Sequence, residues 1–254
     1  MGSMTVIELF KHPVKGFTAE SCSSLHLQTG EAIAGDRALA ITHGRSAFDR
    51  NTQAWAPRRN FLVVAHSPEL SAIRCAYDDN SEVLTLSKDD RFLFDQNVSN
   101  PGVEEALNAA LKHFGPISQP GPYALVRALD APFTDSPTKT VSLMNSQSAR
   151  QLEMFVGIPL SKRRFRGNVW FEGTRPFEER DWIGQEMQLG KARIRIVENI
   201  DRCAALDVEP GLGERNHPVL KTLNQQLGHN QFGVLAEVLS DGEVSVGDTL
   251  RRMS

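Results

Sequence analysis

Short apolar stretches bounded by turn residues make up most of the first half of the chain. Residues 6–10, 38–42 and 61–65 are compact apolar runs, and residues 83–86 and 92–94 have the spacing of a meander pair. Runs of this length that are rich in branched and aromatic side chains are typical of strands. We therefore predict that each of these stretches forms a strand.

Helical periodicity occurs in three places along the chain. Apolar residues recur at intervals of three and four positions over residues 103–114, 149–156 and 220–227. A proline precedes the first and third runs, Ser146 precedes the second, and a glycine follows each of them. Prolines and serines of this kind are common at the start of a helix, and glycines are common just beyond its end. The pattern predicts three helices.

The second half of the chain also contains strand patterns. Residues 169–171 are apolar, and residues 190–200 alternate between aliphatic and arginine positions. Residues 234–238 and 244–246 flank an Asp-Gly pair, which is typical of a tight hairpin. No glycine-rich dinucleotide or phosphate loop follows a strand, and the elements do not form a βαβαβ series. We predict a strand-rich α+β fold with barrel-like sheets.

A segment rich in proline and glycine, residues 115–130, has the composition of an exposed connection. The 254 residues are enough for two modest domains. We predict a domain boundary here, which gives a β-rich domain of residues 4–118 and a second domain of residues 119–254. The residues before Met4 are interpreted as an expression remnant, because they lack the features of a secretory signal.

Composition excludes several classes of protein. The hydrophobic fraction is 40%, the charged fraction 23% and the formal net charge −3, which leaves no basic excess for binding nucleic acid. No apolar run approaches the roughly 20 residues that cross a bilayer, so we expect no membrane span. The three cysteines share no C-x-x-C spacing, and a reducing, cytoplasmic location fits them best.

A basic segment over residues 162–168, Lys-Arg-Arg-Phe-Arg-Gly-Asn, directly precedes the strand at residues 169–171. One interpretation is a solvated charged turn. The other is an anion clamp, in which arginines beside a sheet edge make paired hydrogen bonds to phosphate oxygens. The residues alone leave both interpretations open.

The tripeptide at residues 201–203, Asp-Arg-Cys, follows the alternating strand. A lone cysteine after a strand is most often a small buried hydrophobic residue. Arg202 could instead hold the Cys203 thiol as a thiolate, which is both a soft metal ligand and a nucleophile. Cys22 and Cys75 are interpreted as structural.

Two further segments have similar alternatives. Residues 12–16 (His-Pro-Val-Lys-Gly), with Gly-Asp-Arg at residues 35–37, could cradle an anion or form an ordinary turn with a solvated lysine. Residues 55–59 place two arginines beside a tryptophan, and we interpret them as a surface loop with a stacking pair. The histidines form no zinc-type spacing, and no serine lies in a nucleophile elbow.

Taken together and in order, these segments resemble the MOSC family, the C-terminal domains of molybdenum cofactor sulfurases. The front part resembles the β-barrel domain that precedes MOSC, through Pro-Val-Lys at residues 13–15 and Gly-Asp-Arg at residues 35–37. The back part resembles MOSC itself, a β-barrel with peripheral helices. It is matched at residues 164–168, 182–184, 202–203, 208–210, 232–234 and 246–248. The chain is also similar to the mitochondrial amidoxime-reducing component and its bacterial counterparts.

The resemblance implies a molybdenum cofactor, Mo-molybdopterin, held between the two parts. By this resemblance Cys203 is the metal ligand and forms the catalytic centre with Arg202 and Asp201. The residues expected to bind the cofactor are Lys15, Gly16, Arg37, Asp135, Ser136, Arg164, Arg166 and Asn168.

Three departures from the family pattern bear on this assignment. Gly16 stands where relatives commonly have serine, so one hydroxyl contact to the cofactor is missing. Gly167 replaces a frequent proline, which loosens the turn before Asn168. Residues 209–213 replace an Asp-Pro-x-Thr-Gly loop and lack its threonine.

The implied function is a molybdenum-dependent oxidoreductase that reduces small N-hydroxylated compounds, such as amidoximes and hydroxylamines. The chain lacks the cysteines of the ferredoxin module that some bacterial relatives carry, so electrons would come from an external ferredoxin, flavoprotein or cytochrome. One alternative is a sulfur carrier or transferase with a persulfide on Cys203. Because no pyridoxal-phosphate module is present, that sulfur would come from a partner. The other alternative is a non-catalytic carrier of the cofactor.

Overall fold

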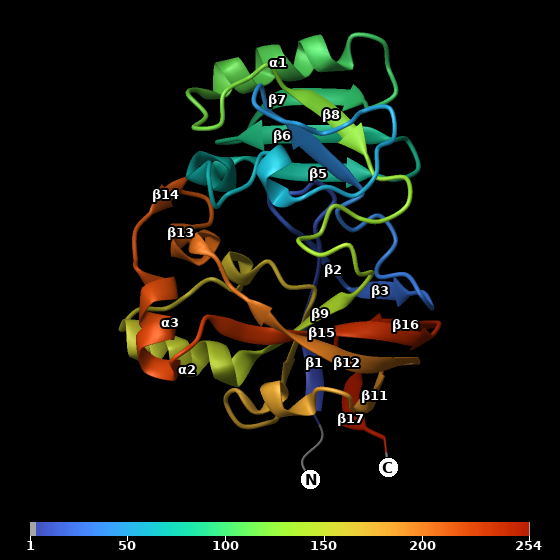
Figure 1. The fold of residues 1–254 in the computed structure, drawn as a ribbon, viewed down its shortest axis with the longest axis vertical. Coiled ribbons are helices and arrows are strands. Elements are labelled where there is room, and N and C mark those ends of the chain that lie inside the picture. Colours follow the sequence, from blue (N-terminus) through green and yellow to red (C-terminus); the bar gives the residue numbers. More distant parts are fainter. Residues whose placement is uncertain (1–3, 254) are drawn as a thin grey trace.

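The computed structural model describes residues 4–253, so the predicted expression remnant at residues 1–3 lies outside the described residues. Within this range, seven strands of the main sheet close into a barrel, because β10 pairs with β1 at the point where the sheet meets itself. The barrel forms the lower part of Figure 1. Its strands are β1 (Met4–Lys11), β9 (Val141–Asn145), β10 (Val169–Glu172), β11 (Glu186–Leu189), β12 (Ala192–Asp201), β15 (Gln231–Ser240) and β17 (Thr249–Arg252).

The barrel is filled by side chains from alternate positions of its strands. In β12, Ala192, Ile194 and Ile196 are fully buried while Arg193 and Arg195 are exposed, as the alternating pattern predicts. Each aliphatic side chain buried in this way contributes about 1.5–3 kcal/mol to stability. The barrel interior is thus a packed core, and ligand binding must take place outside it.

A second layer, the upper half, comprises residues 39–127 and lies above the barrel (Figure 1). Here β5, β6 and β7 form an antiparallel sheet and β4 pairs with β8. Leu107 and Leu111 of α1 pack into the same core as Leu84 and Leu86 of β6. The elements of the upper half are β4 (Leu39–Thr42), β5 (Arg74–Asp78), β6 (Val83–Lys88), β7 (Arg91–Asn97), α1 (Val103–Phe114) and β8 (Ala124–Arg127).

Short elements complete the described chain. The remaining strands and α-helices are β2 (Glu20–Cys22), β3 (Ser24–Leu27), α2 (Ser146–Val156), β13 (Val208–Glu209), β14 (Glu214–Arg215), α3 (Val219–Leu227) and β16 (Gly242–Ser245). The 3-10 helices are η1 (Arg58–Asn60), η2 (Pro68–Ala72), η3 (Lys162–Phe165), η4 (Glu178–Trp182) and η5 (Ala204–Asp207). The fold is strand-rich α+β, as predicted from the sequence.

All three predicted helices are confirmed. The cap of α2 differs by one residue from the prediction, because Asn145 and not Ser146 accepts the hydrogen bond from the backbone of Gln147, at 2.9 Å. Gly157 ends this helix in a left-handed conformation, as expected. The predicted meander pair is also confirmed, as β6 and β7. The neighbouring strand β5 was not predicted from the sequence.

The predicted strand at residues 61–65 is wrong. Only Phe61 makes a β-bridge, to Thr42. The backbone N–H of Val63 is instead bonded to the side-chain carbonyl of Gln119, at 3.0 Å. The apolar run is buried because Phe61 and Val63 pack in one hydrophobic cluster and Leu62 and Val64 in another, and not because it belongs to a sheet.

The predicted hairpin around residues 241–242 is also wrong, since β16 pairs with β3 and not with β15. Both edges of β15 are already occupied by β9 and β12, so no edge is left for a returning strand. The Asp241 carboxylate accepts from the backbone of Thr29 at 2.7 Å and directs the chain toward β3.

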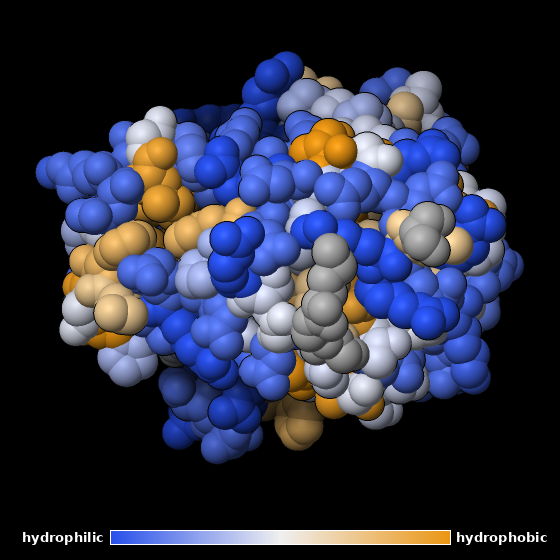
Figure 2. Space-filling model, turned by 90° about the horizontal axis from the view of Figure 1, so that it is seen from below, coloured by the Kyte–Doolittle hydropathy of each residue, from blue (hydrophilic) through white to orange (hydrophobic). Residues whose placement is uncertain are grey.

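The barrel and the upper half are joined by several crossings of the chain. β1 belongs to the barrel, the following residues lead into the upper half, and the chain returns to the barrel after β8. No helix within residues 4–253 is long and apolar enough to cross a membrane. The barrel end seen in Figure 2 is mostly hydrophilic, with separate hydrophobic patches.

Candidate functional site

A cavity of about 340 Å³ lies where the end of β12 meets the loops that connect the barrel with the upper half. Every site residue predicted from the sequence lines it, although these residues are spread over almost 190 positions of the chain. They are Lys15, Gly16, Arg37, Asp135, Ser136, Arg164, Arg166, Asn168, Asp201, Arg202 and Cys203. The structure thus brings them together around one space, and their chemical roles stay predictions.

Lys15 reaches the cavity from the turn after β1. The turn is held in place by the backbone N–H of Lys15, which donates a hydrogen bond to the Leu39 carbonyl at 2.8 Å. The Lys15 ammonium is buried and donates to the Phe133 carbonyl at 2.8 Å and to the Asp135 carboxylate at 2.7 Å. Burial lowers the pKa of Lys15, and the Asp135 charge opposes that shift.

Gly16 allows this turn to pass close to the backbone of the upper half. Its φ of +86° is left-handed, and a Cβ here would lie 2.1 Å from the Leu62 carbonyl oxygen. A serine, the common residue in relatives, therefore does not fit this backbone. The departure noted in the sequence has a steric cause.

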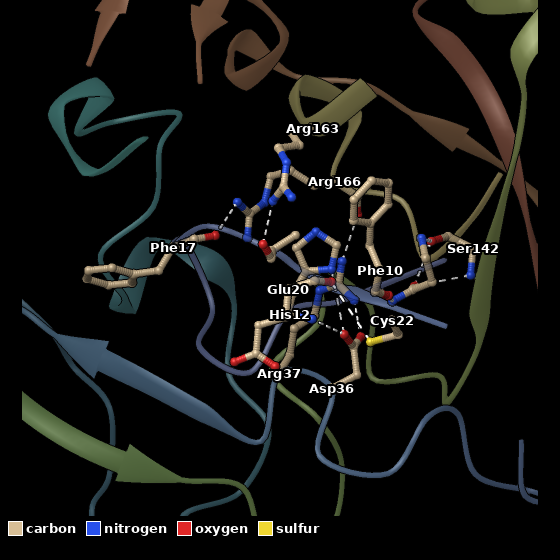
Figure 3. A network of polar contacts seen from close by, with 12 residues as sticks. Phe10, His12, Phe17, Glu20, Cys22, Asp36, Arg37, Ser142, Arg163 and Arg166 are labelled. Carbon is tan, nitrogen blue, oxygen red and sulfur yellow. Dashed lines mark hydrogen bonds and ion pairs between the residues drawn. The ribbon is translucent and has the colours of Figure 1, made fainter. Parts of the chain in front are cut away.

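Arg37 links this turn to the basic segment of residues 162–168. As Figure 3 shows, its guanidinium lies between the Asp36 carboxylate, with which it forms an ion pair, and the Arg166 carbonyl, to which it donates at 2.8 Å. Asp36 also accepts from the backbone of His12 at 2.6 Å. Burial and the nearby Arg37 charge lower the pKa of His12 to about 3, so this imidazole is neutral at physiological pH.

Arg166 and Arg202 carry the uncompensated charge of the site. Arg166 donates to the Phe17 carbonyl at 2.7 Å (Figure 3), and Arg202 donates to the carbonyls of Phe165 and Phe232 at 2.6 and 2.7 Å. Neither forms an ion pair within residues 4–253.

Burial is the main cause that lowers the pKa of each of these two guanidinium groups to about 10, so both stay charged at neutral pH. Partly buried cations without a carboxylate partner favour an anion in the adjoining space. Arg164 and Arg166 of the basic segment thus belong to the cavity wall and not to a solvated turn, and binding of an anion there stays a prediction.

Arg164 and Asn168 also line the cavity, but their polar groups hold other parts of the wall. The Arg164 side chain is buried, pairs with Glu209 and donates to the Leu206 carbonyl at 3.0 Å. The Asn168 amide accepts from the Ser142 hydroxyl at 2.7 Å and donates to the Phe10 carbonyl at 3.1 Å. Glu209 thus has a structural use in the loop that departs from the family pattern.

Cys203 follows β12 directly and lines the cavity as a free, partly buried thiol. Arg166 and Arg202 line the same cavity and are its charged neighbours. Cys75, in contrast, packs in the core of the upper half, and burial raises the pKa of its thiol. Cys75 is therefore a packing residue, as interpreted from the sequence, whereas Cys203 faces the cavity and its chemical role stays a prediction.

Arg58 was missed by the sequence analysis. Residues 55–59 were interpreted as a surface loop with a stacking pair, but Arg58 lines the cavity and its guanidinium lies 3.6 Å from the Asp135 carboxylate. The Trp55 indole N–H anchors the loop by donating to the Thr134 carbonyl at 3.1 Å. The basic pair was visible in the sequence, but which loops meet at the cavity is a property of the fold.

Asn199 and Glu198 of β12 also line the cavity without having been predicted. The Asn199 side-chain oxygen is buried and has no hydrogen-bond partner among the described residues. Across residues 4–253, no group of three or more His, Cys, Asp or Glu side chains is arranged to hold a metal ion. A metal bound at Cys203 would therefore need most of its ligands from an organic cofactor.

The fold and the site define the class of this protein as a closed barrel with a cavity at its end that is lined by basic side chains and a free thiol. Residues 130–251 match the MOSC domain and residues 3–112 match the MOSC N-terminal beta barrel domain. The chain belongs to the MOSC family.

Curated relatives are similar over part of the chain. The molybdenum cofactor sulfurase of Anopheles gambiae is 33% identical over 91 residues, which are 34% of this chain and 12% of the sulfurase. That of Bos taurus is 33% identical over 72 residues, which are 28% of this chain and 8% of the sulfurase. The match thus spans only a small part of these longer proteins.

Solved structures give weaker similarity. The YUAD protein from Bacillus subtilis aligns over 98% of this chain and 94% of its own, with 12% identity and a TM-score of 0.47. YiiM from Geobacillus stearothermophilus aligns over 45% of this chain and 54% of its own, with 22% identity and a TM-score of 0.36.

Proposed function

We propose that this protein binds the molybdenum cofactor and reduces small N-hydroxylated compounds, such as amidoximes and hydroxylamines. The observation that carries the proposal is the free Cys203 thiol in a cavity that is also lined by cations from distant parts of the chain, among them the partly buried Arg166 and Arg202, which form no ion pair within the described residues. The overall reaction takes up two electrons and two protons, removes the oxygen of an N–OH group and releases water.

The residues present fit the cofactor. Its phosphate needs cations, and the buried Lys15 and the partly buried Arg166 and Arg202 provide positive charge that carbonyl groups and Asp135 compensate only in part. Its metal needs a thiolate, and Cys203 provides one at the cavity wall. The cofactor would supply the oxygen-accepting and electron-accepting chemistry.

The chain's own residues would bind and orient. Lys15 and Arg166 would hold the phosphate, and Arg37 would hold the Arg166 loop in place through the Arg166 carbonyl. Cys203 would be the protein's ligand to the metal. Asp201 is exposed at the end of β12 and lines the cavity, and in the proposed reaction it would pass a proton between solvent and the substrate.

Electrons would come from a separate ferredoxin, flavoprotein or cytochrome. The proposal includes a reducing, cytoplasmic location, supported by the free state of Cys22, Cys75 and Cys203. It includes no nucleic-acid partner, because the formal net charge is −3.

Sulfur transfer is a second candidate, favoured by the similarity to molybdenum cofactor sulfurases. Cys203 would carry a persulfide, an acceptor thiolate would attack its outer sulfur, and the Cys203 thiolate would leave. The flanking guanidinium groups of Arg166 and Arg202 would stabilise that leaving thiolate.

Metal analysis separates the two candidates. The full chain and its Cys203→Ser variant are produced in cells that make the cofactor, with Cys75→Ser as a matched control. We expect about one molybdenum per chain in the wild type and control, and at least a tenfold loss in Cys203→Ser. The wild type should also reduce an amidoxime with an artificial electron donor. Equal molybdenum in all three proteins removes Cys203 from the ligand role, and a persulfide on Cys203 without molybdenum supports sulfur transfer.

A further inference from the structure

Asp135 occupies an unusual position for a residue expected to bind a cofactor that carries a phosphate. Its carboxylate accepts from the Lys15 ammonium at 2.7 Å and lies 3.6 Å from the Arg58 guanidinium. A carboxylate and a phosphate carry charge of the same sign and accept hydrogen bonds from the same donors. Asp135 and a ligand phosphate therefore compete for the same cation.

The two partners of this ion pair differ in their freedom to move. The Lys15 side chain is only 6% exposed and its ammonium also donates to the Phe133 carbonyl, so it stays in the wall. The Asp135 side chain is 62% exposed and belongs to the irregular segment between β8 and β9. If a ligand anion takes the place of Asp135 at Lys15, the Asp135 carboxylate is therefore the group that rotates, toward solvent, while Lys15 stays in place.

The pairing also serves the protein before a ligand binds. A buried ammonium without a counter-charge is strongly disfavoured, and the Asp135 charge acts against the effect of burial on Lys15. Arg37 has Asp36 as a permanent partner deep in the fold, where the Asp36 side chain is 5% exposed. Asp135 is thus the exposed and exchangeable counter-ion of the cavity, and Asp36 the fixed one.

We propose that Asp135 is a displaceable counter-ion that sets how much negative charge the cavity accepts. A ligand phosphate replaces its carboxylate at Lys15 and Arg58, so Asp135 acts as a competitor of the ligand and not as one of its contacts. The inference rests on the proposed function only in taking the ligand to carry a phosphate.

Binding of inorganic phosphate to the full chain, made in a host without the cofactor, tests this role. Asp135→Asn keeps the size of the side chain and removes its charge. We expect it to bind orthophosphate about tenfold more tightly than the wild type in isothermal titration calorimetry at constant ionic strength.

Asp79→Asn is the matched control, because Asp79 pairs with Lys11 outside the cavity and the net charge changes equally. It should stay within twofold of the wild type. Adding Lys15→Met to Asp135→Asn should abolish the gain. The proposal is overturned if Asp135→Asn binds phosphate equally or more weakly than the wild type, or if Asp79→Asn shows the same gain.

The outcome is separate from that of the metal analysis. Tighter phosphate binding by Asp135→Asn supports the competitor role even if Cys203→Ser retains its molybdenum and the proposed function fails. Unchanged phosphate binding overturns the competitor role even if Cys203 proves to be the metal ligand.

Discussion

At the scale of single residues, buried charge is compensated in two ways in this protein. Arg37 meets a buried carboxylate, Asp36, whereas Arg166 and Arg202 meet backbone carbonyls. A carboxylate partner neutralises the positive charge of a guanidinium. Carbonyl dipoles do not neutralise it, so most of the charge can still attract a ligand. The choice of partner therefore decides which cations hold the fold and which face the cavity.

The buried, neutral His12 predicts an acid-sensitive stability. Its pKa is about 3 in the folded protein and about 6.5 when unfolded, so between these values the unfolded chain binds more protons. The contribution of neutral His12 to the free energy of unfolding is therefore fully present above pH 6.5 and decreases as the pH falls below that value. Between pH 6 and 4 the wild type should lose about 1.4 kcal/mol per pH unit more than His12→Asn, measured by urea unfolding. Parallel pH profiles for the two proteins would show that His12 is not the group responsible.

At the scale of elements, the Asn168 side chain joins three strands of the barrel. Asn168 lies between η3 and β10 in the chain. Its side chain accepts a hydrogen bond from the Ser142 hydroxyl of β9 and donates one to the Phe10 carbonyl of β1. The basic segment and the barrel are joined to each other through this amide. Removing it should disturb the barrel as well as the cavity.

Asn168→Ala should therefore lower the free energy of unfolding of the cofactor-free protein by about 2–3 kcal/mol, because the Phe10 carbonyl and the Ser142 hydroxyl lose a buried partner. Chemical denaturation measures the change. The exposed Asn51, changed to alanine, should stay within about 0.5 kcal/mol of the wild type. If the two variants unfold alike, Asn168 has no structural role beyond the cavity.

The sequence predicts elements better than their pairings here. Alternation in residues 190–200 and the periodicity of the three helices led to β12, α1, α2 and α3, because each pattern reflects burial on one face. The run at residues 61–65 failed because a buried loop is as apolar as a strand. The hairpin at residues 241–242 failed because the edges of β15 were taken by strands distant in sequence.

At the scale of the whole molecule, the cavity exists only because the barrel and the upper half are joined. Lys15 and Arg37 come from the connection into the upper half, Arg58 from the upper half itself, and Cys203 from the barrel. Most of these residues were predicted from the resemblance to a family, because no spacing along the chain relates them to one another. Arg166 spans the junction through the Phe17 carbonyl.

Arg166→Gln should accordingly lower the affinity for orthophosphate at least tenfold in calorimetry, because it removes a buried cation from the cavity wall. Arg163→Gln is its control, since the Arg163 guanidinium is exposed and bonded to the Ala19 carbonyl. The control should bind within twofold of the wild type. Equal losses in both variants would mean that phosphate responds to surface charge and not to the cavity.

The pairing of β1 with β17 has a consequence for folding. Met4 of β1 pairs with Leu250 of β17, so these neighbouring strands are separated by almost all of the described residues. Until β17 has been made, β1 lacks one of its barrel neighbours and exposes an edge that can join other chains. Nascent protein should therefore depend on chaperones, and ligand loading has to wait until β17 has joined the barrel.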